Sequence, residues 1–358
     1  MDRSPTRSRG RVASRIIALT AAALFGFLAG RSSGPTPPVA DAQSTDSARA
    51  RTSVADSSSG ALATSDSAAT YAEMRGVDFR VGEGVALRIR HLVGAMQGRA
   101  GVVDFDDKMS FTTWIDSAEV GLTGEDLSNL LNKHVFAYKG APLKHLKVEM
   151  QGTELRQKGV LHKGIDIPFD IIAQVSVTPE GLLRLHPRRT RILGVNGDAL
   201  MKALGLNLQK LIDLSKAQGV TVKKNDLFID PARVLPPPVI KGRVVAVRVE
   251  GNELVQTYTI PADAPAAVLA AARRRPAIPD ESQQHYMYFR GGKLHFGAKL
   301  LMTDAEMQVV DEQPADPFDF DLEHYQRQLV AGYSQTLPNM GLEVHMPDAG
   351  KVKQVARR

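Results

Sequence analysis

Apolar and polar residues alternate along the middle of the chain. On either side of a break at Gln151-Gly152-Thr153, mostly apolar residues recur at every second position, which predicts a β-hairpin with one apolar face. A second alternating run covers residues 165–177 and turns at residues 178–181 into a strand near Leu183. Proline at the second and glycine at the fourth turn position favour a type I turn. The pattern therefore predicts an antiparallel meander.

A helical period follows the meander. Over residues 200–214, apolar residues recur in steps of three and four, which places them on one stripe of an amphipathic helix. Asp198 or Asn196 can cap the start of this helix, and Gly219 can end it in a left-handed conformation.

Strand patterns return after this helix. Residues 220–229 predict a strand, and the run Pro236-Pro237-Pro238 excludes both helix and central strand. Residues 242–250 and 253–260 then predict a second hairpin around Gly251-Asn252.

The stretch before the meander predicts two strands and a helix. Residues 85–89 and 111–115 alternate as strands do, and a helix with leucines at helical spacing follows Thr123. Thr123 and Asp126 have the spacing of a capping box. Residues 75–260 are therefore predicted to form one α+β domain with long antiparallel strands.

The tail is predicted to be a small C-terminal α+β unit over residues 284–348. Residues 261–283, rich in alanine, proline and charge, indicate a linker before it. Aromatic residues on both sides of Gly291-Gly292 predict a hairpin, which a helix near 324–330 and a strand at 342–346 follow. Because tyrosines gather here, this face is a candidate surface for an envelope protein partner or a glycan. The alternative is a lid or an extra strand that completes the main sheet.

The N-terminus has the layout of an export signal. Five arginines precede a short apolar run at residues 16–29, and Ala40-Asp41-Ala42 offers a cleavage site. Residues 1–30 are therefore predicted to be a signal peptide or, if uncleaved, a membrane anchor at residues 12–30. Residues 31–72, dense in serine and alanine, are predicted to be a disordered tether. Both versions place the folded part in the periplasm or otherwise outside the cytoplasm, and the alternative is a disordered arginine-rich tail before a buried helix.

Composition limits the possible classes of function. The chain has 358 residues with 43% apolar content, enough for a sizeable core, and it has no cysteine for a disulfide or a thiolate metal site. Six Arg and two Asp in residues 1–42 account for +4 of the net charge of +6. The remaining charge is nearly balanced, which argues against a nucleic-acid partner.

Catalytic and metal-binding signatures are missing from the sequence. It lacks a G-x-S-x-G elbow, a P-loop, an H-E-x-x-H motif and a cysteine nucleophile, so we predict no enzyme, no cofactor and no metal. The trio Asp104, Asp106 and Asp107 suits an exposed turn better than a calcium loop, because the distal glutamate is absent. Residues 316–320 stay a secondary candidate site.

An apolar sheet face next to a leucine-striped helix predicts a groove for a lipid. Leucine, isoleucine and methionine are flexible and fit acyl chains without imposing one shape. The residues predicted to contact lipid are Ile167, Phe169, Ile171, Leu200, Leu204, Leu208 and Leu211. The same positions also suit a closed core.

Arginines after the turn at Gly181 are candidates for an anionic headgroup or a membrane surface. They are Arg184, Arg188, Arg189 and Arg191. Guanidinium groups bind phosphate through two parallel hydrogen bonds. The alternative is a solvated strand face.

The order of parts resembles a known family. It runs from Trp114-Ile115-Asp116-Ser117-Ala118-Glu119 through the helix near Leu127, the strand at 159–168, the helix at 200–214 and the break at Leu235-Pro236-Pro237-Pro238. Residues 85–260 thus resemble bacterial envelope proteins similar to the mycobacterial lipomannan elongation factor, near the tubular lipid-binding (TULIP) superfamily. The resemblance implies a long, curved antiparallel sheet wrapped around one or two amphipathic helices, with an apolar groove for phospholipid. The serine-rich leader and the C-terminal segment depart from it.

These observations predict an exported protein that binds phospholipid or another apolar ligand at a membrane surface without catalysis. The main alternative is an envelope interaction module with a closed core and a tyrosine-rich partner-binding tail. A hydrolase with an unrecognised carboxylate pair is the third hypothesis.

Overall fold

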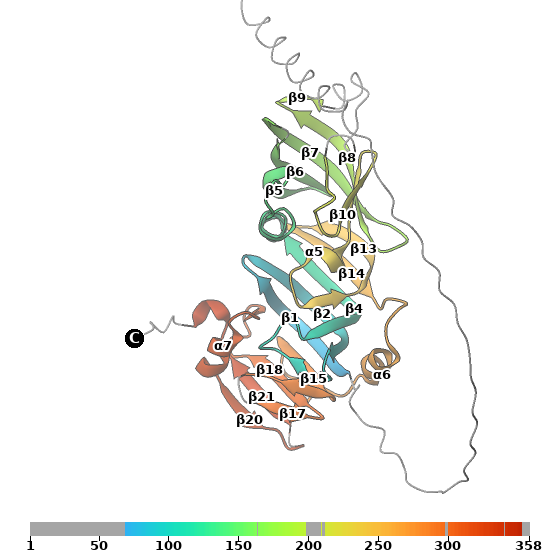
Figure 1. Cartoon of the computed structure of the whole chain (residues 1–358). Coiled ribbons are helices and arrows are strands. Elements are labelled where there is room, and N and C mark those ends of the chain that lie inside the picture. The colour runs from blue at the N-terminus through green and yellow to red at the C-terminus, as the bar shows by residue number, and fades with distance from the viewer. Residues whose placement is uncertain are drawn as a thin grey trace, which may run out of the picture. The chain divides into compact units, whose positions relative to one another are not determined.

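The computed structural model describes residues 69–162, 164–197, 209, 212–297, 300–339 and 341–352 (Figure 1). The predicted signal or anchor at residues 1–30 and nearly all of the predicted tether lie outside these residues. The leucine-striped helix also lies outside them for the most part, including Leu200, Leu204, Leu208 and Leu211. The described chain is mostly β-sheet with a few short helices. None of its helices is long and apolar enough to span a membrane.

The larger sheet has eleven strands from both ends of the described chain. Its main path runs β13 (Arg243–Glu250), β14 (Glu253–Thr259), β4 (Phe111–Thr123), β2 (Val85–Gly98), β1 (Thr70–Gly82), β15 (Tyr286–Arg290), β18 (Glu306–Asp311), β21 (Leu342–Met346) and β20 (Tyr333–Thr336). Two short strands join it from the side, β12 (Val239–Lys241) on β4 and β19 (Phe318–Asp321) on β1. The predicted hairpin around Gly251-Asn252 is confirmed as β13 and β14.

Strand β1 was not predicted from the sequence, because its apolar period changes phase at Gly76. Met74 is buried before this glycine and Val77 after it, so the side chains that face the main core are not two residues apart. Gly76 has a φ of +58°, a left-handed conformation that glycine adopts without a Cβ penalty. A Cβ at this position would lie 2.3 Å from the His285 ring.

The second sheet has seven strands and curls into a half-barrel (Figure 1). Its order is β10 (Val220–Lys223), β11 (Asp226–Ile229), β8 (Leu183–Ile192), β7 (Asp166–Val177), β6 (Glu154–His162) and β5 (Leu143–Gln151), with β9 (Val195–Asn196) beside β8. The meander predicted from the alternating pattern is confirmed as β5 to β8. The turn after β7 has the expected hydrogen bond, in which the Gly181 amide donates to the Thr178 carbonyl over 2.9 Å.

A helix separates the two sheets along the chain. Helix α2 (Gly124–Leu130) begins with the predicted capping box, in which the Thr123 hydroxyl accepts from the Asp126 amide. The π-helical turn η2 (Leu131–Val135) continues it. Ser128 Oγ accepts from the Val148 amide over 2.8 Å, and Asn132 bonds to both backbone groups of Leu146. These side chains occupy the backbone edge of β5, so the sheet ends there and the single long sheet expected from the sequence becomes two.

Two predictions near the second sheet are wrong. Residues 220–229 do not form one strand but the hairpin of β10 and β11, which turns at Lys224 with a φ of +58°. Residues 212–214 do not extend a helix. Leu214 is nevertheless buried, so the apolar stripe indicated contact with the core correctly at this position.

The C-terminal hairpin prediction is also wrong. Strand β15 pairs with β1 and β18, whereas β16 (Lys293–His295) pairs with β17 (Leu301–Thr303) and β3 (Val103–Asp104) in a separate three-stranded sheet. The reason is that β15 is buried on both faces, as a central strand must be. Gly291 and Gly292 both have positive φ and lead the chain out of the larger sheet. The strand at 342–346 and the helix near 324–330 are confirmed as β21 and α7 (Tyr325–Ala331).

The remaining helices are short. Helix α5 (Pro231–Val234) precedes the proline run, and η3 (Ala349–Lys351) follows β21. The predicted linker contains helix α6 (Ala266–Arg274), which packs against β1 and β2. Its basic C-terminus is held at Arg275, which pairs with Asp116 over 3.0 Å.

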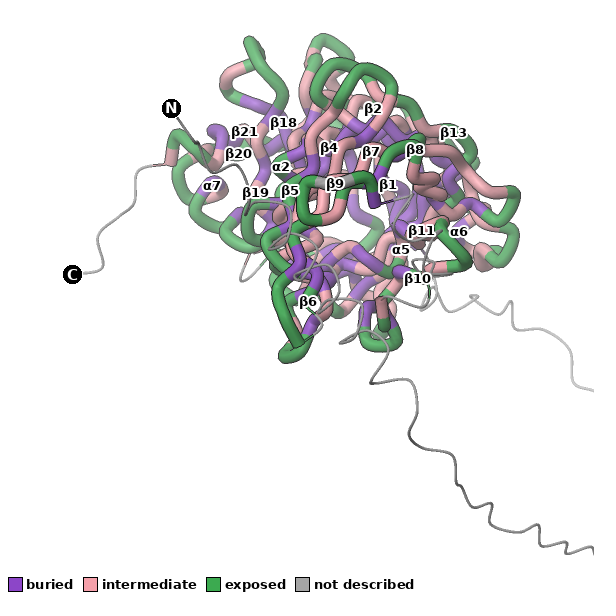
Figure 2. The backbone as a smooth tube through the Cα atoms, turned by 90° about the horizontal axis from the view of Figure 1, so that it is seen from above, coloured by how far each residue is buried: buried purple, intermediate pink, exposed green. Residues whose placement is uncertain are grey.

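Aromatic side chains fill the interior beside the C-terminal strands. Phe105 lies 5.5 Å from Phe111, 5.4 Å from Phe289 and 5.3 Å from Phe296 between ring centroids. All four are at most 2% exposed. Buried positions follow the strands, whereas many connecting turns are exposed (Figure 2). This part of the molecule is therefore a tightly packed core.

Candidate functional site

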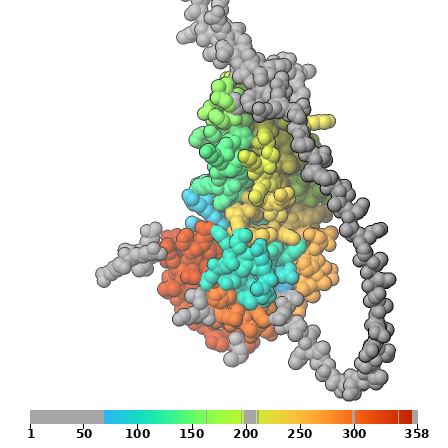
Figure 3. Space-filling model, in the orientation of Figure 1, coloured from blue at the N-terminus to red at the C-terminus, as the bar shows by residue number. Residues whose placement is uncertain are grey.

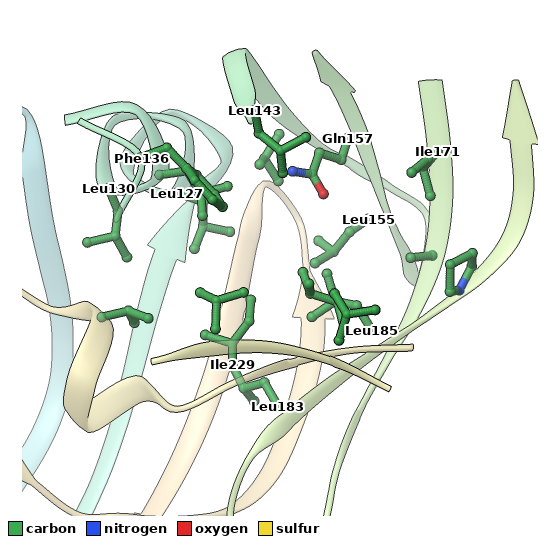
Figure 4. A pocket seen from close by; sticks show the side chains of 18 of the residues that line it. Leu127, Leu130, Phe136, Leu143, Leu155, Gln157, Ile171, Leu183, Leu185 and Ile229 are labelled. Atoms are coloured by element: carbon green, nitrogen blue, oxygen red, sulfur yellow. The ribbon is translucent and has the colours of Figure 1, made fainter. Parts of the chain in front are cut away.

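An apolar cavity lies along the concave face of the second sheet. Strands β5 to β8 form its wall, and α2, η2, the β10–β11 hairpin, α5 and the strands β4 and β14 of the larger sheet contribute further residues. Figure 4 shows leucines from α2 and from the sheet that point into the same space. Figure 3 shows the sheet in green beside the segment that follows it in yellow, in agreement with the pairing of β8 with β11.

The cavity has a volume of about 140 Å³, and it continues into a groove that is open to solvent. An engineered cavity of roughly 150 Å³ in another protein stays dry and binds small apolar molecules. The cavity can therefore hold an apolar group, and the open groove gives an extended chain room to continue.

No charged side chain lines this groove among the described residues. Its polar lining groups are Gln157, Thr190, Gln256 and the Tyr258 hydroxyl. Gln256 lies 3% exposed and accepts a hydrogen bond from Tyr258 over 3.0 Å. A wall of this composition suits hydrocarbon and disfavours any ion, because an unpaired charge is costly to remove from water.

The apolar wall is less completely covered than the aromatic core. Four residues that line the groove are only partly buried, namely Phe169, Ile171, Leu185 and Ile229. The phenylalanines beside β15 are fully buried. Partly exposed aliphatic residues on one continuous surface still gain free energy when a further apolar group covers them.

Three of the seven predicted lipid contacts are brought together in this wall. Ile167, Phe169 and Ile171 lie on β7 at alternate positions and all line the groove. The other four, Leu200, Leu204, Leu208 and Leu211, lie outside the described residues.

Other lining residues were missed, although the sequence carried signals for them. They come from the helical leucines Leu127, Leu130 and Leu131, from the alternating positions Leu183 and Leu185, and from Val222, Leu227 and Ile229. The period of each segment predicted an apolar face. What it could not predict is that these faces meet around one space, because that depends on the pairing of β8 with β11.

Phe169 owes its position to a glycine on the neighbouring strand. Gly159 is its partner in the register of β6 and β7. A Cβ on Gly159 would lie 2.6 Å from Leu146 and 2.9 Å from the Phe169 ring. The ring therefore occupies space that a side chain at position 159 would need.

The four predicted headgroup arginines lie on β8. Its groove-lining residues are Leu183, Leu185 and Pro187, and then Thr190 and Ile192. The lining positions change from odd to even residue numbers at a β-bulge. Ala173 pairs with Pro187 and Ile172 pairs with Arg189, so Arg188 has no partner residue on β7. Arg188, Arg189 and Arg191 are exposed and lie between or beside the lining positions, so they belong to the opposite face of the sheet.

Arg184 differs from the other three arginines. It binds Asp226 of β11 over 2.6 Å, and His186 Nδ1 lies 2.6 Å from the other carboxylate oxygen. Burial acts to raise the pKa of Asp226, but the hydrogen bonds with His186 and Arg184 outweigh it and lower the pKa below its usual range. Arg184 thus ties β8 to β11, whereas Arg188 and Arg189 form no ion pair within the described part of the chain.

The acidic positions singled out in the sequence have structural partners. Asp104 lies 2.8 Å from His295 Nδ1, and Asp106 accepts hydrogen bonds from Tyr325 and Gln326. Oxygen and nitrogen atoms of Asp104, Asp106 and His295 come within 4.8 Å of one another. Asp104 and Asp106 thus both have hydrogen-bond partners in neighbouring side chains.

The secondary candidate at residues 316–320 contributes its two phenylalanines to the core, whereas Asp316 and Pro317 are exposed. Phe318 and Phe320 are fully buried in β19, and Asp319 binds Arg80 over 2.5 Å. The tyrosines of the tail are also internal, since Tyr286, Tyr288 and Tyr325 are at most 4% exposed. Tyr333, 57% exposed, is the tail tyrosine on the surface.

Comparison of the chain with protein-family models, with curated proteins and with solved structures gives no match. The function is therefore inferred from the fold and from the groove.

Proposed function

We propose that this chain binds the acyl chain of a lipid, in particular a phospholipid, in the groove of the second sheet and carries it outside the cytoplasm without catalysing a reaction. The observation that carries the proposal is the continuous aliphatic wall, which is open along one side and contains no charged residue among the described ones. A ligand that binds to a wall of this kind must itself be apolar where it touches the wall.

The hydrophobic effect supplies enough free energy for such binding. Each methylene group that leaves water contributes about 0.8 kcal/mol. A chain of ~14 methylenes would thus gain on the order of 10 kcal/mol before the cost of ordering it. The wall needs no specific contact to hold the chain, which agrees with its aliphatic composition.

The curved sheet beside a short amphipathic helix supports a tubular lipid-binding (TULIP-like) architecture as part of the proposal. Helix α2 and the turn η2 place Leu127, Leu130 and Leu131 along the groove. The apolar run at residues 16–29, preceded by arginines, supports export or anchoring at a membrane. A protein located there would meet lipid bilayers directly.

The exposed arginines of β8 provide a surface that can contact a lipid bilayer. Arg188, Arg189 and Arg191 are three of four consecutive residues, and the bulge places them on one face. Guanidinium groups on a surface are attracted to anionic lipid headgroups. In this proposal they hold the sheet at an anionic membrane while the groove on its other face receives the chain.

A pair of adjacent isoleucines tests the groove. Ile171 lines it, whereas Ile172 lies next along β7 and is not part of the lining. Native mass spectrometry and organic extraction of the purified full chain should detect co-purifying lipid. The Ile171→Asp variant should lose this lipid and the Ile172→Asp variant should keep it, with circular dichroism showing that both are folded.

The opposite result would favour an interaction module with a closed core. In that case the unmodified chain carries no lipid and takes none from phospholipid vesicles. Ile171→Asp would then lower the melting temperature without changing any bound ligand.

A further inference from the structure

In the wall of the groove, the side chain of Gln157 has no hydrogen-bond partner among the described residues. Gln157 lies on β6 between Val148 of β5 and Ile171 of β7 in the strand register, and both neighbours line the groove. Figure 4 shows its amide among Leu143, Leu155 and Ile171, directed into the pocket. The amide forms no hydrogen bond to the described residues, and the side chain is only partly buried, so water can reach it.

The other polar lining groups do not share this property. Gln256 is buried and accepts from Tyr258, and Thr190 has an interaction of its own. Gln157 is also not at an end of the wall, since Leu155 precedes it and Leu161 follows it on the same strand and both line the groove. Its amide is therefore a polar group surrounded by apolar side chains of the wall.

A ligand that fills the groove must remove water from this amide. If the ligand is hydrocarbon alone, the N–H donors and the carbonyl oxygen of Gln157 lose their hydration without replacement, which opposes binding. If the ligand has a carbonyl or hydroxyl group at this level, a hydrogen bond replaces the lost water. The same wall offers no cation to the carboxylate of a free fatty acid, so a neutral group is favoured.

We propose that Gln157 selects ligands whose acyl chain is joined to an uncharged ester carbonyl, as in phospholipids and acylglycerols, over alkanes and over free fatty acids. The amide nitrogen would donate to the ester carbonyl. This inference rests on the proposed function, because it names the chemical class of ligand for the same groove.

Competition binding with three probes of equal chain length tests the selectivity. A monoacylglycerol, the corresponding fatty acid and the corresponding alkane would each displace a fluorescent acyl probe from the full chain. The Gln157→Leu variant should bind the monoacylglycerol roughly tenfold more weakly, as expected when one hydrogen bond to a desolvated group is lost. Its affinity for the alkane should stay the same or rise.

Two further variants distinguish the loss of the hydrogen-bond donor from a change in side-chain packing. Gln157→Glu keeps the size of the side chain but removes the N–H donor, so it should lose the preference for the ester as well. Gln174→Leu makes the same change as Gln157→Leu at an exposed position of β7 outside the groove lining, and it should bind all three probes as the unmodified chain does.

Two results would overturn the inference, and they are distinguishable. If the unmodified chain binds acyl probes but Gln157→Leu keeps the preference for the monoacylglycerol, the selectivity assignment is wrong and the proposed function stands. If the unmodified chain binds none of the probes, the proposed function fails and the selectivity fails with it.

Discussion

Asp311 is a buried carboxylate with an unsatisfied oxygen. Its side chain is 1% exposed, and Oδ2 has no hydrogen-bond partner in the described structure. His285 Nδ1 lies 3.9 Å from this oxygen, which is too far for a hydrogen bond. Burial raises the pKa of Asp311 to about 6, and the nearby charge of Asp348 acts in the same direction. The protonated form of this residue is therefore favoured by folding.

The pH dependence of stability should show the Asp311 shift. Because its pKa is higher in the folded than in the unfolded state, the stabilisation is fully present below the unfolded value of 3.8 and is lost as the pH rises through about 6. Asp311→Asn cannot ionise and should avoid this loss. Relative to the variant, the unmodified chain should lose on the order of 2 kcal/mol of unfolding free energy across this range. Urea denaturation at a series of pH values measures the difference.

Asp107→Asn is the control for charge alone, since Asp107 is exposed. Its stability profile should run parallel to that of the unmodified chain between pH 4 and pH 6. If the Asp311→Asn profile is parallel as well, the carboxylate is ionised in the folded protein and the argument from burial is wrong.

At the scale of elements, local patterns predicted strands and caps, but long-range pairing was not accessible from them. The meander of β5 to β8 follows from an uninterrupted two-residue period, and the cap of α2 follows from Thr123 and Asp126. Strand β15 was predicted but given the wrong partner. Its neighbour β1 lies about two hundred residues earlier in the sequence, and nothing local specifies that pairing.

The candidate site was predictable to a similar extent. The alternation along β7 identified Ile167, Phe169 and Ile171 as one face, and all three line the groove. The bulge in β8 was not visible in the sequence, because Arg188 and Arg189 continue an apparently regular strand. Gln157 occupies a position where the two-residue period predicts an apolar side chain. What distinguishes it in three dimensions is that none of the described residues forms a hydrogen bond with its amide.

The β8 bulge leads to a prediction about membrane binding. Replacement of both Arg188 and Arg189 by Gln should weaken binding to vesicles that contain phosphatidylglycerol by roughly thirtyfold, at about 1 kcal/mol for each arginine near an anionic surface. Vesicle co-sedimentation at low and at high salt measures this change. Attraction of this kind should decrease as salt is added.

A double variant of Arg75 and Arg273 to Gln provides the control, since both arginines are exposed and the change in net charge is the same. It should bind the vesicles nearly as the unmodified chain does. Equal weakening in the two double variants would show that net charge, and not the face of β8, determines membrane binding.

At the scale of the whole molecule, the burial of apolar side chains differs between the two sheets. The larger sheet encloses fully buried phenylalanines that contact one another, and its strands come from both ends of the described chain. The wall of the second sheet is aliphatic and only partly buried. A sealed core supplies stability that an open groove cannot, so the molecule can keep unfilled apolar surface without unfolding.

This division implies that the C-terminal strands are needed for the fold of the rest. Strand β1 lies between β2 and β15, and β15 is buried on both faces. A chain that ends at residue 283 would leave the edge of β1 unpaired and would expose Met74 and Phe79, whose cover includes the C-terminal strands β15 and β19. We expect this truncated chain to lose its cooperative thermal transition in calorimetry and to aggregate. Adding residues 284–352 as a separate chain during refolding should restore the transition, because the two parts share one sheet. A truncated chain that melts sharply on its own would show instead that the C-terminal segment folds as an independent unit, as the sequence pattern alone had indicated.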